Sequence, residues 1–390
     1  MVRDLSQLDQ YLASEEIDGY LLRASGADAN QRYLSGFGAP DAFATLYTKG
    51  ETHLLVRNLE RALARKESRA NSVAGHSDFG GKELAAEYGP TRAEYRVLKR
   101  FVGEHAVESV AVPSSFPIGI ADGLRELSVV VTPDHDQVID SIRSIKTAPE
   151  IESIVAVQRA TERAMHRVEE MLQSASIDGD RLFHNSAPLT SECVKEEIDI
   201  TLLREGCLAQ ESIVACGSDG AEPHNRGAGS LRPHEPIVVD IFPYDRTSKY
   251  FADMTRTFCV GEPTDTAQQW FDLTKEAQAI ALDMLGPGVT GEEVHGAVCE
   301  VYENAGIPTL RTDEGTETGF IHSTGHGLGL ELHEAPRLGT GAGELKPGHV
   351  VTVEPGVYDP EVGGFRIEDL VVITEDGIDN LTDYHRSFIL

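Results

Sequence analysis

The chain has 390 residues, enough for two domains, and 40% of them are hydrophobic, which is ample for buried cores. It carries 64 Asp and Glu against 34 Lys and Arg, a formal net charge of −30, and this charge disfavours nucleic acid and anionic membranes as partners. Because no run of about 18 apolar residues and no apolar N-terminal segment appears, we expect a cytoplasmic protein without a membrane span.

The acidic residues are spread along the chain, and only nine of the basic residues are lysines. Such a charge repels itself at low ionic strength, and salt screens that repulsion. The composition therefore predicts a halophilic protein, adapted to molar salt. An ordinary acidic protein is the alternative.

Residues 1–145 alternate between helical and strand patterns. The segment "LSQLDQYLASEEI" has helical spacing of apolar residues, whereas "GYLLRA", "FATLYT" and "THLLVR" are short apolar runs typical of strands. The runs "SVAVPSS" and "SVVVTP" continue this alternation. We therefore predict an α/β domain that ends near Lys146.

Residues 146–390 contain one sequence of elements twice. An amphipathic helix begins near Pro149 and runs through "PEIESIVAVQRATERAMHRVEEMLQSA". The loop "SASIDGDRLFHNSAPLTS" and a helix that ends at Gly206 follow. The hairpin "PIVVDIFPYDRTSKYFADMTRTFCV" completes this first set of elements. A second helix pair follows, the later helix opening with a capping box at Thr290, and then the strand–turn–strand "HVVTVEPGVYDPEVGGFRIEDLVVIT". The repeat predicts two similar halves packed about a pseudo-twofold axis.

The two hairpins carry carboxylates at matching places. Asp253 follows Asp240 by 13 positions, and Glu368 follows Glu354 by 14. If the halves face each other, the four side chains converge, and they cannot all stay ionised in a buried site without a counter-charge. Two divalent cations such as Mn²⁺, Co²⁺ or Zn²⁺ would neutralise them. Taken singly, each acid could instead be a surface turn residue.

A family resemblance is carried by six segments in order over residues 210–375: "GAEPHNRG", "IVVDIF", "FADMTRTF", "HSTGHGLGLELHEAP", "VVTVEPGVY" and "RIEDLVVI". The chain resembles the pita-bread metallopeptidases, specifically the Xaa-Pro peptidases (aminopeptidase P and prolidase). "RYLSGFG" resembles the creatinase-type N-terminal domain. The resemblance implies an α/β N-terminal domain over 1–145 and, over 146–390, an α+β pita-bread catalytic domain with an internal pseudo-twofold duplication.

The resemblance also implies two divalent metal ions, foremost Mn²⁺, and five ligands: Asp240, Asp253, His326, Glu354 and Glu368. Asp253 and Glu368 would bridge the ions. The glycines around His326 would let the backbone approach them. One feature departs from the family, because the turn between Asp240 and Asp253 is longer than usual. That turn leaves Asp245 as a weaker alternative ligand.

Five side chains receive other roles from the resemblance. His333 would hydrogen-bond the scissile carbonyl or its oxyanion, and Glu354 would also carry the proton from water to the leaving nitrogen. His224 would bind substrate or shuttle a proton. His322 would line the proline subsite, or it is a packed structural histidine. Arg366 would support a ligand or contact substrate, unless it is a surface residue.

The expected reaction is hydrolysis of the peptide bond before proline, with a metal-bridged hydroxide as nucleophile. The expected substrates are small peptides with proline at the second position, and the resemblance suggests a homodimer. Whether the enzyme is a dipeptidase or an aminopeptidase stays open. Among enzymes with this fold, methionine aminopeptidase and creatinase fit the sequence less well. A non-catalytic binding module is the alternative outside catalysis, and such modules lose ligands that are all present here.

Overall fold

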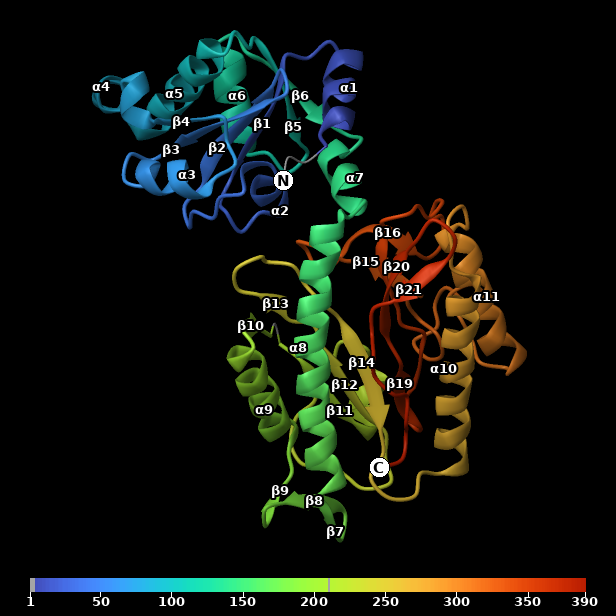
Figure 1. Cartoon of the computed structure of the whole chain (residues 1–390). Coiled ribbons are helices and arrows are strands. Elements are labelled where there is room, and N and C mark those ends of the chain that lie inside the picture. The colour runs from blue at the N-terminus through green and yellow to red at the C-terminus, as the bar shows by residue number, and fades with distance from the viewer. Residues whose placement is uncertain (1–3, 210) are drawn as a thin grey trace. The chain divides into compact units, whose positions relative to one another are not determined.

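The computed structural model describes residues 4–209 and 211–390 (Figure 1). The chain divides into two compact units, residues 1–143 and residues 144–390. The sequence prediction drew the boundary between residues 145 and 146.

The first unit is built on a six-stranded sheet with the order β4-β3-β2-β1-β5-β6. The strands β1, β2 and β3 pair antiparallel, and the remaining pairs are parallel. The predicted apolar runs of this region are confirmed as strands, because each contributes buried side chains to the sheet. The strands are β1 (Gly19–Ala24), β2 (Phe43–Thr48), β3 (Glu51–Val56), β4 (Ser72–Gly75), β5 (Ser109–Pro113) and β6 (Val130–Asp134).

Helices alternate with these strands, as the α/β prediction requires. A core of Leu, Val and Phe side chains joins α5 to the sheet, and the apolar face of α5 includes Val97, Phe101 and Val102. The helices are α1 (Ser6–Ser14), α2 (Ala29–Ser35), α3 (Arg61–Glu67), α4 (Gly81–Tyr88), α5 (Pro90–Glu104), α6 (Ile118–Glu126) and α7 (Val138–Ser144), with a short 3₁₀ helix, η1 (His76–Phe79).

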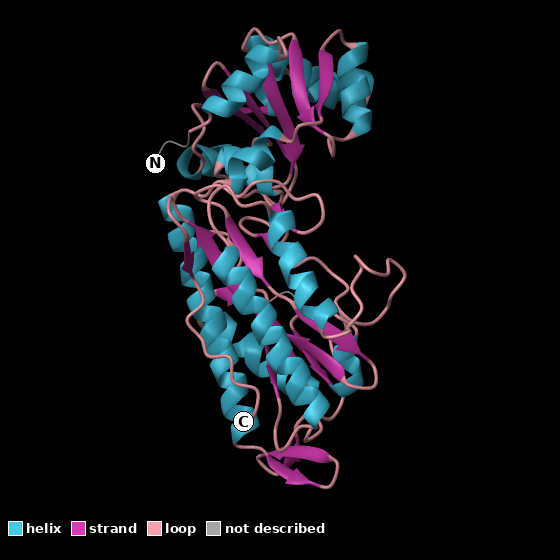
Figure 2. Cartoon of the chain, turned by 90° about the vertical axis from the view of Figure 1, so that its right-hand side faces the viewer, coloured by secondary structure: helices cyan, strands magenta, loops and turns pink. Residues whose placement is uncertain are grey.

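The second unit contains two helix pairs, α8 with α9 and α10 with α11 (Figures 1 and 2). The helices are α8 (Ala148–Gln173), α9 (Ser191–Arg204), α10 (Asp265–Met284) and α11 (Gly291–Asn304). Both α8 and α11 begin with a capping box, Thr147 with Glu150 and Thr290 with Glu293. The predicted apolar face of α8 is confirmed as buried: Ile154, Val157, Ala164, Val168 and Met171.

Each helix pair packs on its own antiparallel sheet. The first sheet has the order β11-β12-β14, and the second has the order β16-β15-β17-β20-β21. Their strands are β11 (Ile213–Cys216), β12 (Ile237–Ile241), β14 (Met254–Phe258), β15 (Gly325–Gly327), β16 (Glu334–Leu338), β17 (Val350–Val353), β20 (Asp369–Ile373) and β21 (Ile378–Asn380).

Two separate hydrophobic clusters confirm the internal duplication at the level of packing. One cluster joins α8 and α9 to the first sheet, and the other joins α10 and α11 to the second sheet. Each half therefore buries its own apolar residues. None of the helices in the described residues has both the length and the hydropathy needed to span a bilayer.

The segment after α8 differs from its prediction as a loop, because residues 176–188 form a three-stranded meander. It projects beyond the ends of the helices in Figures 1 and 2. Its side chains are mostly exposed and polar, so the apolar alternation that reveals a strand is missing. The smaller elements are β7 (Ser176–Asp178), β8 (Arg181–His184), β9 (Ala187–Pro188), β10 (Cys207–Leu208), η2 (Gly217–Ala221), β13 (Tyr244–Asp245), β18 (Gly356–Asp359) and β19 (Gly363–Arg366).

Candidate metal centre and active site

The four carboxylates lie at corresponding ends of the two sheets. Asp240 lies in β12 and Asp253 directly precedes β14, whereas Glu354 directly follows β17 and Glu368 directly precedes β20. The pairing of β12 with β14 places Asp240 opposite Thr255. The pairing of β17 with β20 places Val353 opposite Asp369. The two carboxylates of each half are therefore neighbours on adjacent strands.

The candidate ligands of both halves converge in one cluster. One donor atom each from Asp253, His326 and Glu368 lies within 4.8 Å of the others. The Nε2 atom of His326 is 3.7 Å from Asp253 Oδ2 and 3.3 Å from Glu354 Oε1. Asp240 is close enough to raise the pKa values of the other three carboxyls. The structure thus brings together all five residues of the predicted ligand set.

Burial and mutual repulsion disfavour the ionised forms of these carboxyls. The side chain of Asp253 is 7% exposed and Glu368 is 2% exposed, so water cannot compensate their charges. Burial, followed by the neighbouring carboxylates, raises the pKa of Asp253 and that of Glu368 well above their ordinary values. Burial also raises the pKa of Glu354 to about 7. The cluster therefore needs protons or cations near neutral pH.

Unsatisfied atoms in the cluster favour cations. Asp240 Oδ1, Asp253 Oδ1 and Glu368 Oε1 are buried and have no hydrogen-bond partner among the described residues. The Nδ1 atom of His326 lies 3.0 Å from the carbonyl oxygen of Gly327, which requires Nδ1 to be the donor. The unprotonated Nε2 consequently faces the carboxyl oxygens. Oxygen donors with one imidazole suit a divalent metal such as Mn²⁺.

Two threonines orient the cluster, although neither was predicted from the sequence. Thr255 Oγ1 donates to Glu368 Oε2 at 2.8 Å. Thr352 Oγ1 donates to Glu354 Oε1 at 3.2 Å and accepts from the backbone N–H of His326 at 3.0 Å. Each threonine lies two positions from a carboxylate on the same strand face. That alternation was the available signal.

Arg366 is buried behind Asp240 rather than exposed to solvent. Its Nη2 donates to Asp240 Oδ2 at 2.6 Å, its Nη1 to the Tyr358 hydroxyl at 2.8 Å and its Nε to Thr255 Oγ1 at 3.2 Å. The side chain is 5% exposed. Of the roles expected for Arg366, these contacts favour support of a ligand over contact with substrate.

His322 continues this chain of hydrogen bonds through Tyr358, another residue that the sequence analysis did not single out. Its Nδ1 lies 2.7 Å from the carbonyl oxygen of Ser323 and must donate, so Nε2 accepts from the Tyr358 hydroxyl at 2.9 Å. Burial and then the charge of Arg366 lower the pKa of His322 to about 3. His322 is thus a neutral imidazole fixed beside the cluster.

His333 and His224 lie at the open side of the cluster. The ring of His333 meets the ring of His326 edge to face at 4.3 Å. Burial, then His326 and His224, lower the pKa of His333 to about 4, although its surface is partly open to solvent. His224 lies in the exposed loop after η2 and also lowers the pKa values of His322 and Glu354. Both histidines are therefore near the candidate ligands.

Comparison with protein families decides the class of this site. Residues 152–375 match the model described as metallopeptidase family M24, and residues 5–145 match the creatinase/prolidase N-terminal domain. The chain belongs to metallopeptidase family M24. The resemblance drawn from the sequence motifs is confirmed, and a family of metal-dependent hydrolases accounts for a cluster of unsatisfied carboxylates.

One curated relative matches this M24 peptidase over its whole length, and another matches about two thirds of it. It is 28% identical over 395 residues to the Xaa-Pro dipeptidase of Pyrococcus furiosus, with all of both chains covered. It is 32% identical over 269 residues to the probable dipeptidase PepE of Mycobacterium bovis, which covers 68% of this chain and 65% of the relative.

Solved structures confirm the fold class of this M24 peptidase. The prolidase of Pyrococcus horikoshii superposes with a TM-score of 0.80 at 26% identity, covering 98% of this chain and 99% of that one. The X-Pro aminopeptidase of Thermotoga maritima gives a TM-score of 0.77 at 27% identity, covering 96% and 98%. A creatinase-type N-terminal domain and a pita-bread catalytic domain are thus present.

The segment that joins His326 to His333 is held at its middle and directly after its last residue. Lys146 Nζ contacts Glu334 Oε1 at 2.5 Å, and these side chains are 1% and 6% exposed. The backbone N–H of Phe251 donates to the carbonyl oxygen of Gly329 at 2.9 Å. A buried ion pair and a turn of the first half therefore fix the loop that carries both histidines, and neither contact was predicted.

Glycine is required where this segment passes the second sheet. A Cβ atom at Gly325 would lie 2.0 Å from the carbonyl oxygen of Thr352, and one at Gly327 would lie 2.3 Å from that of Ala335. The glycines around His326 therefore allow close approach to neighbouring backbone, and their predicted role of letting the backbone approach the metal ions stays a prediction. Asp245 instead accepts from the backbone N–H groups of Thr247 and Ser248 in its own turn.

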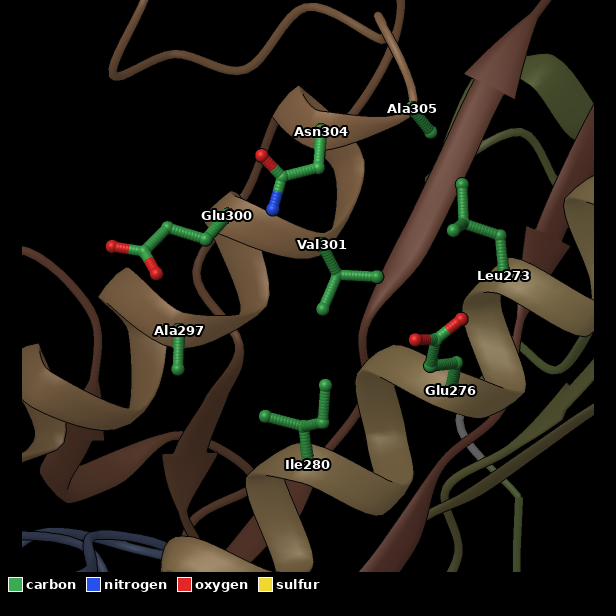
Figure 3. A pocket seen from close by; sticks show the side chains of 8 residues that line it. All are labelled: Leu273, Glu276, Ile280, Ala297, Glu300, Val301, Asn304 and Ala305. Carbon is green, nitrogen blue, oxygen red and sulfur yellow. The ribbon is translucent and has the colours of Figure 1, made fainter.

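A separate hollow of about 410 Å³ lies between α10 and α11 (Figure 3). Figure 3 shows Glu276 on α10 and Glu300 on α11 at its rim, with Ile280 and Val301 between them. None of the candidate metal ligands lines this hollow. It is a groove between two surface helices and not part of the catalytic site.

Proposed function

We propose that this M24 peptidase is a dinuclear metal-dependent Xaa-Pro dipeptidase. The observation that carries the proposal is the buried cluster of four carboxyls and one imidazole with three unsatisfied carboxyl oxygens. The relatives named Xaa-Pro dipeptidase support the substrate class, since they match over nearly the full length of both chains. Retention of all five donors argues against a non-catalytic binding module.

In this proposal five side chains hold two divalent cations: Asp240, Asp253, His326, Glu354 and Glu368. Asp253 and Glu368 would be the ligands common to both cations. Mn²⁺ suits the oxygen-rich donor set best, with Co²⁺ and Zn²⁺ as alternatives. Cations of this kind lower the pKa of bound water and polarise the scissile carbonyl.

Glu354 and His333 supply the proton transfer and the hydrogen bond to substrate. Glu354, whose Oε1 lies 3.3 Å from His326 Nε2 in the cluster, takes a proton from the attacking water and delivers it to the proline nitrogen. His333 is neutral at pH 7, because its pKa is lowered to about 4. Its N–H donates to the carbonyl oxygen as negative charge develops there.

His322 contacts the proline ring, and its buried aromatic neighbours Phe320 and Tyr358 pack around it. The ring of His322 lies 5.2 Å from that of Phe320 and 5.4 Å from that of Tyr358. The hydrogen bonds of His322 to Ser323 and Tyr358 fix its orientation. His224, at the open side, contacts the substrate backbone or moves a proton, and Arg366 holds Asp240.

A positive charge near His333 favours dipeptides over longer peptides. Arg337 is exposed on β16, opposite His326 on β15, and its charge contributes to the lowered pKa values of both His326 and His333. A dipeptide presents its C-terminal carboxylate immediately after proline, within the same site. An arginine there can bind that carboxylate through two parallel hydrogen bonds.

We also propose the domain boundaries, the oligomeric state, the salt requirement and the location of the enzyme. We take residues 1–145 and 146–390 as its domains and expect a homodimer. The net charge of −30 supports function in molar salt. We place the enzyme in the cytoplasm.

A peptide panel tests the proposal. The full chain, loaded with Mn²⁺ in molar KCl, is assayed on Ala-Pro, Ala-Pro amide, Ala-Pro-Ala, Met-Ala-Ala and creatine. Ala-Pro should be hydrolysed fastest, and its amide much more slowly. Hydrolysis of Met-Ala-Ala with Ala-Pro inert would instead assign a methionine aminopeptidase. Two bound metals without hydrolysis of any substrate would support the binding module.

A further inference from the structure

A fully buried arginine lies directly behind the candidate bridging carboxylates. Arg256 is in β14, three residues after Asp253, and is 1% exposed. The equivalent position after Glu368 in the second half is Val371. This cation therefore has no counterpart across the pseudo-twofold axis, and the duplication does not explain it.

Every N–H donor of the Arg256 guanidinium has an acceptor. Nη1 donates to the carbonyl oxygens of Thr255 at 2.9 Å and Glu368 at 2.7 Å. Nη2 donates to Asp369 Oδ1 at 2.8 Å and to the carbonyl oxygen of Tyr384 at 3.1 Å, and Nε donates to that of His385 at 2.8 Å. Such a planar set of five donors joins three segments that are distant in sequence.

These contacts fix Glu368 from several sides. Its carbonyl oxygen accepts from Arg256, and its backbone N–H donates to the Thr255 carbonyl at 3.0 Å. Its Oε2 accepts from the Thr255 hydroxyl at 2.8 Å, which leaves Oε1 as the unsatisfied oxygen. The direction of the free oxygen is thus determined by β14.

The C-terminal segment completes this arrangement. Asp369, 1% exposed, contacts Arg256 through Oδ1, whereas its Oδ2 accepts from Asn380 at 2.8 Å and from Arg386. The ring of Tyr384 lies 5.7 Å from the Arg256 guanidinium. The segment that supplies two carbonyls to Arg256 is itself held by the residue after Glu368.

We propose that Arg256 is a positioning residue for Glu368, and that the backbone carbonyls of Tyr384 and His385, which accept from Arg256, help to hold it in place behind the metal centre. This inference rests on the proposed dinuclear function. A buried ion pair with a purely structural role would affect unfolding but not the affinity for metal. A group that orients a bridging ligand affects metal affinity, typically by about 10–100-fold when it is lost.

The test compares Arg256→Lys with Arg386→Gln in the full chain. Lysine keeps the charge but cannot reach the Glu368 carbonyl and the C-terminal carbonyls together. Arg386→Gln removes a partly exposed cation that contacts Asp369 without touching Glu368. We expect Arg256→Lys to weaken Mn²⁺ binding by about 10–100-fold in calorimetric titration. We expect Arg386→Gln to stay close to wild type.

Unfolding of the metal-free variants in urea separates a structural role from a positioning role. Wild-type Mn²⁺ affinity in a destabilised Arg256→Lys variant would overturn the proposal, and so would equal loss of affinity in Arg386→Gln. If Arg256→Lys does not fold, Tyr384→Ala decides, because it loosens the segment while leaving every Arg256 donor in place. Unchanged Mn²⁺ affinity in Tyr384→Ala would then overturn the proposal, and weakened affinity would support it. Wild-type protein that binds no Mn²⁺ would refute the dinuclear function itself.

Discussion

The two halves of the catalytic unit share their architecture but differ in their contribution to the site. Each half packs a helix pair on an antiparallel sheet around its own core. Each places two carboxylates on neighbouring strands: Asp240 with Asp253, and Glu354 with Glu368. The duplicated part of the fold thus supplies the negative charge.

The two halves contribute unequally to the side chains of the site other than the four carboxylates. The second half carries His322, His326 and His333 in residues 305–349, between α11 and β17, where the first half has the shorter segment 205–236 between α9 and β12. The first half contributes His224 from one exposed loop and the cation Arg256 behind the cluster. The duplicated architecture thus builds the metal cluster, whereas the segment before the carboxylate hairpin of each half supplies the histidines, three from the second half and one from the first.

The largest loss of activity is expected from substituting the carboxylates that the two halves supply at equivalent positions. Asp253→Asn and Glu368→Gln each remove one shared ligand, one from each half, and both should abolish measurable activity together with metal occupancy. The fold should survive, because the apolar strand residues of both cores remain. Metal analysis and peptide assays check this outcome. Two bound ions and full activity in either variant would break the equivalence of the halves.

The next largest loss of activity is expected at His333, a histidine that the second half supplies. His333→Ala should lower kcat by about 10²–10³-fold, the usual loss for one donor to a developing oxyanion. Its KM should change little, because the contribution appears mainly in the transition state. Metal analysis should find both ions still bound.

His326→Ala is the matched control, since it lies in the same loop and its ring touches that of His333. It should lose metal affinity as well as rate. The opposite pattern, metal lost from His333→Ala and retained in His326→Ala, would exchange the two roles. Unchanged rates in both variants would make the whole segment structural.

Prediction from sequence succeeded where the signal is local. The helix faces, the apolar strands and the paired carboxylates follow from spacing over a few residues, and the residues that the family motifs indicate as ligands lie together, although their binding of metal stays a prediction. The polar meander of residues 176–188 was missed because its side chains are largely exposed and give no alternation of apolar residues.

The supporting contacts were missed for a different reason. Lys146 and Glu334 are 188 positions apart, and Arg256 meets the carbonyl of His385 across 129 positions. No periodicity in one sequence joins such partners. A buried charge can be recognised in a strand pattern, but its partner becomes visible only when the chain is folded.

The halves also differ in how their outer carboxylates are compensated, which predicts a dependence on pH. Asp240 contacts Arg366 directly, whereas Glu354, with its pKa raised from 4.5 to about 7, faces Thr352 and His326. Between these pH values the folded metal-free protein binds more protons than the unfolded chain. Its free energy of unfolding should therefore fall as the pH rises from about 4.5 to about 7, by about 3 kcal/mol for Glu354.

Urea unfolding in the presence of a chelator measures this dependence, and Glu354→Gln is the control that should make the decrease smaller, while Asp253 and Glu368 still contribute to it. In the Mn²⁺-loaded protein the cation keeps the carboxyls ionised, so the decrease should disappear. A metal-free protein whose free energy of unfolding increases over the same pH range would contradict the raised pKa of Glu354.

Net charge is the last difference between the halves. Residues 264–390 hold 23 Asp and Glu against six Lys and Arg, whereas residues 144–263 hold 20 against 12. Repulsion at low salt should therefore be concentrated in the second half. The chain's single tryptophan, Trp270, packs beside Phe365 in that half, so its fluorescence reports unfolding there.

The smallest effect is expected from this surface charge. The midpoint of thermal unfolding followed by Trp270 should rise from low salt to molar KCl, because salt screens the repulsion.

Replacing both rim residues of the hollow in Figure 3, Glu276→Gln with Glu300→Gln, should raise the low-salt midpoint by about 1–3 °C and reduce its salt dependence. The matched double variant on α8 and α9, Glu152→Gln with Glu196→Gln, should change it less. A midpoint that is flat or falls with salt would remove the halophilic interpretation, and equal shifts in the two double variants would show that the repulsion is shared evenly between the halves.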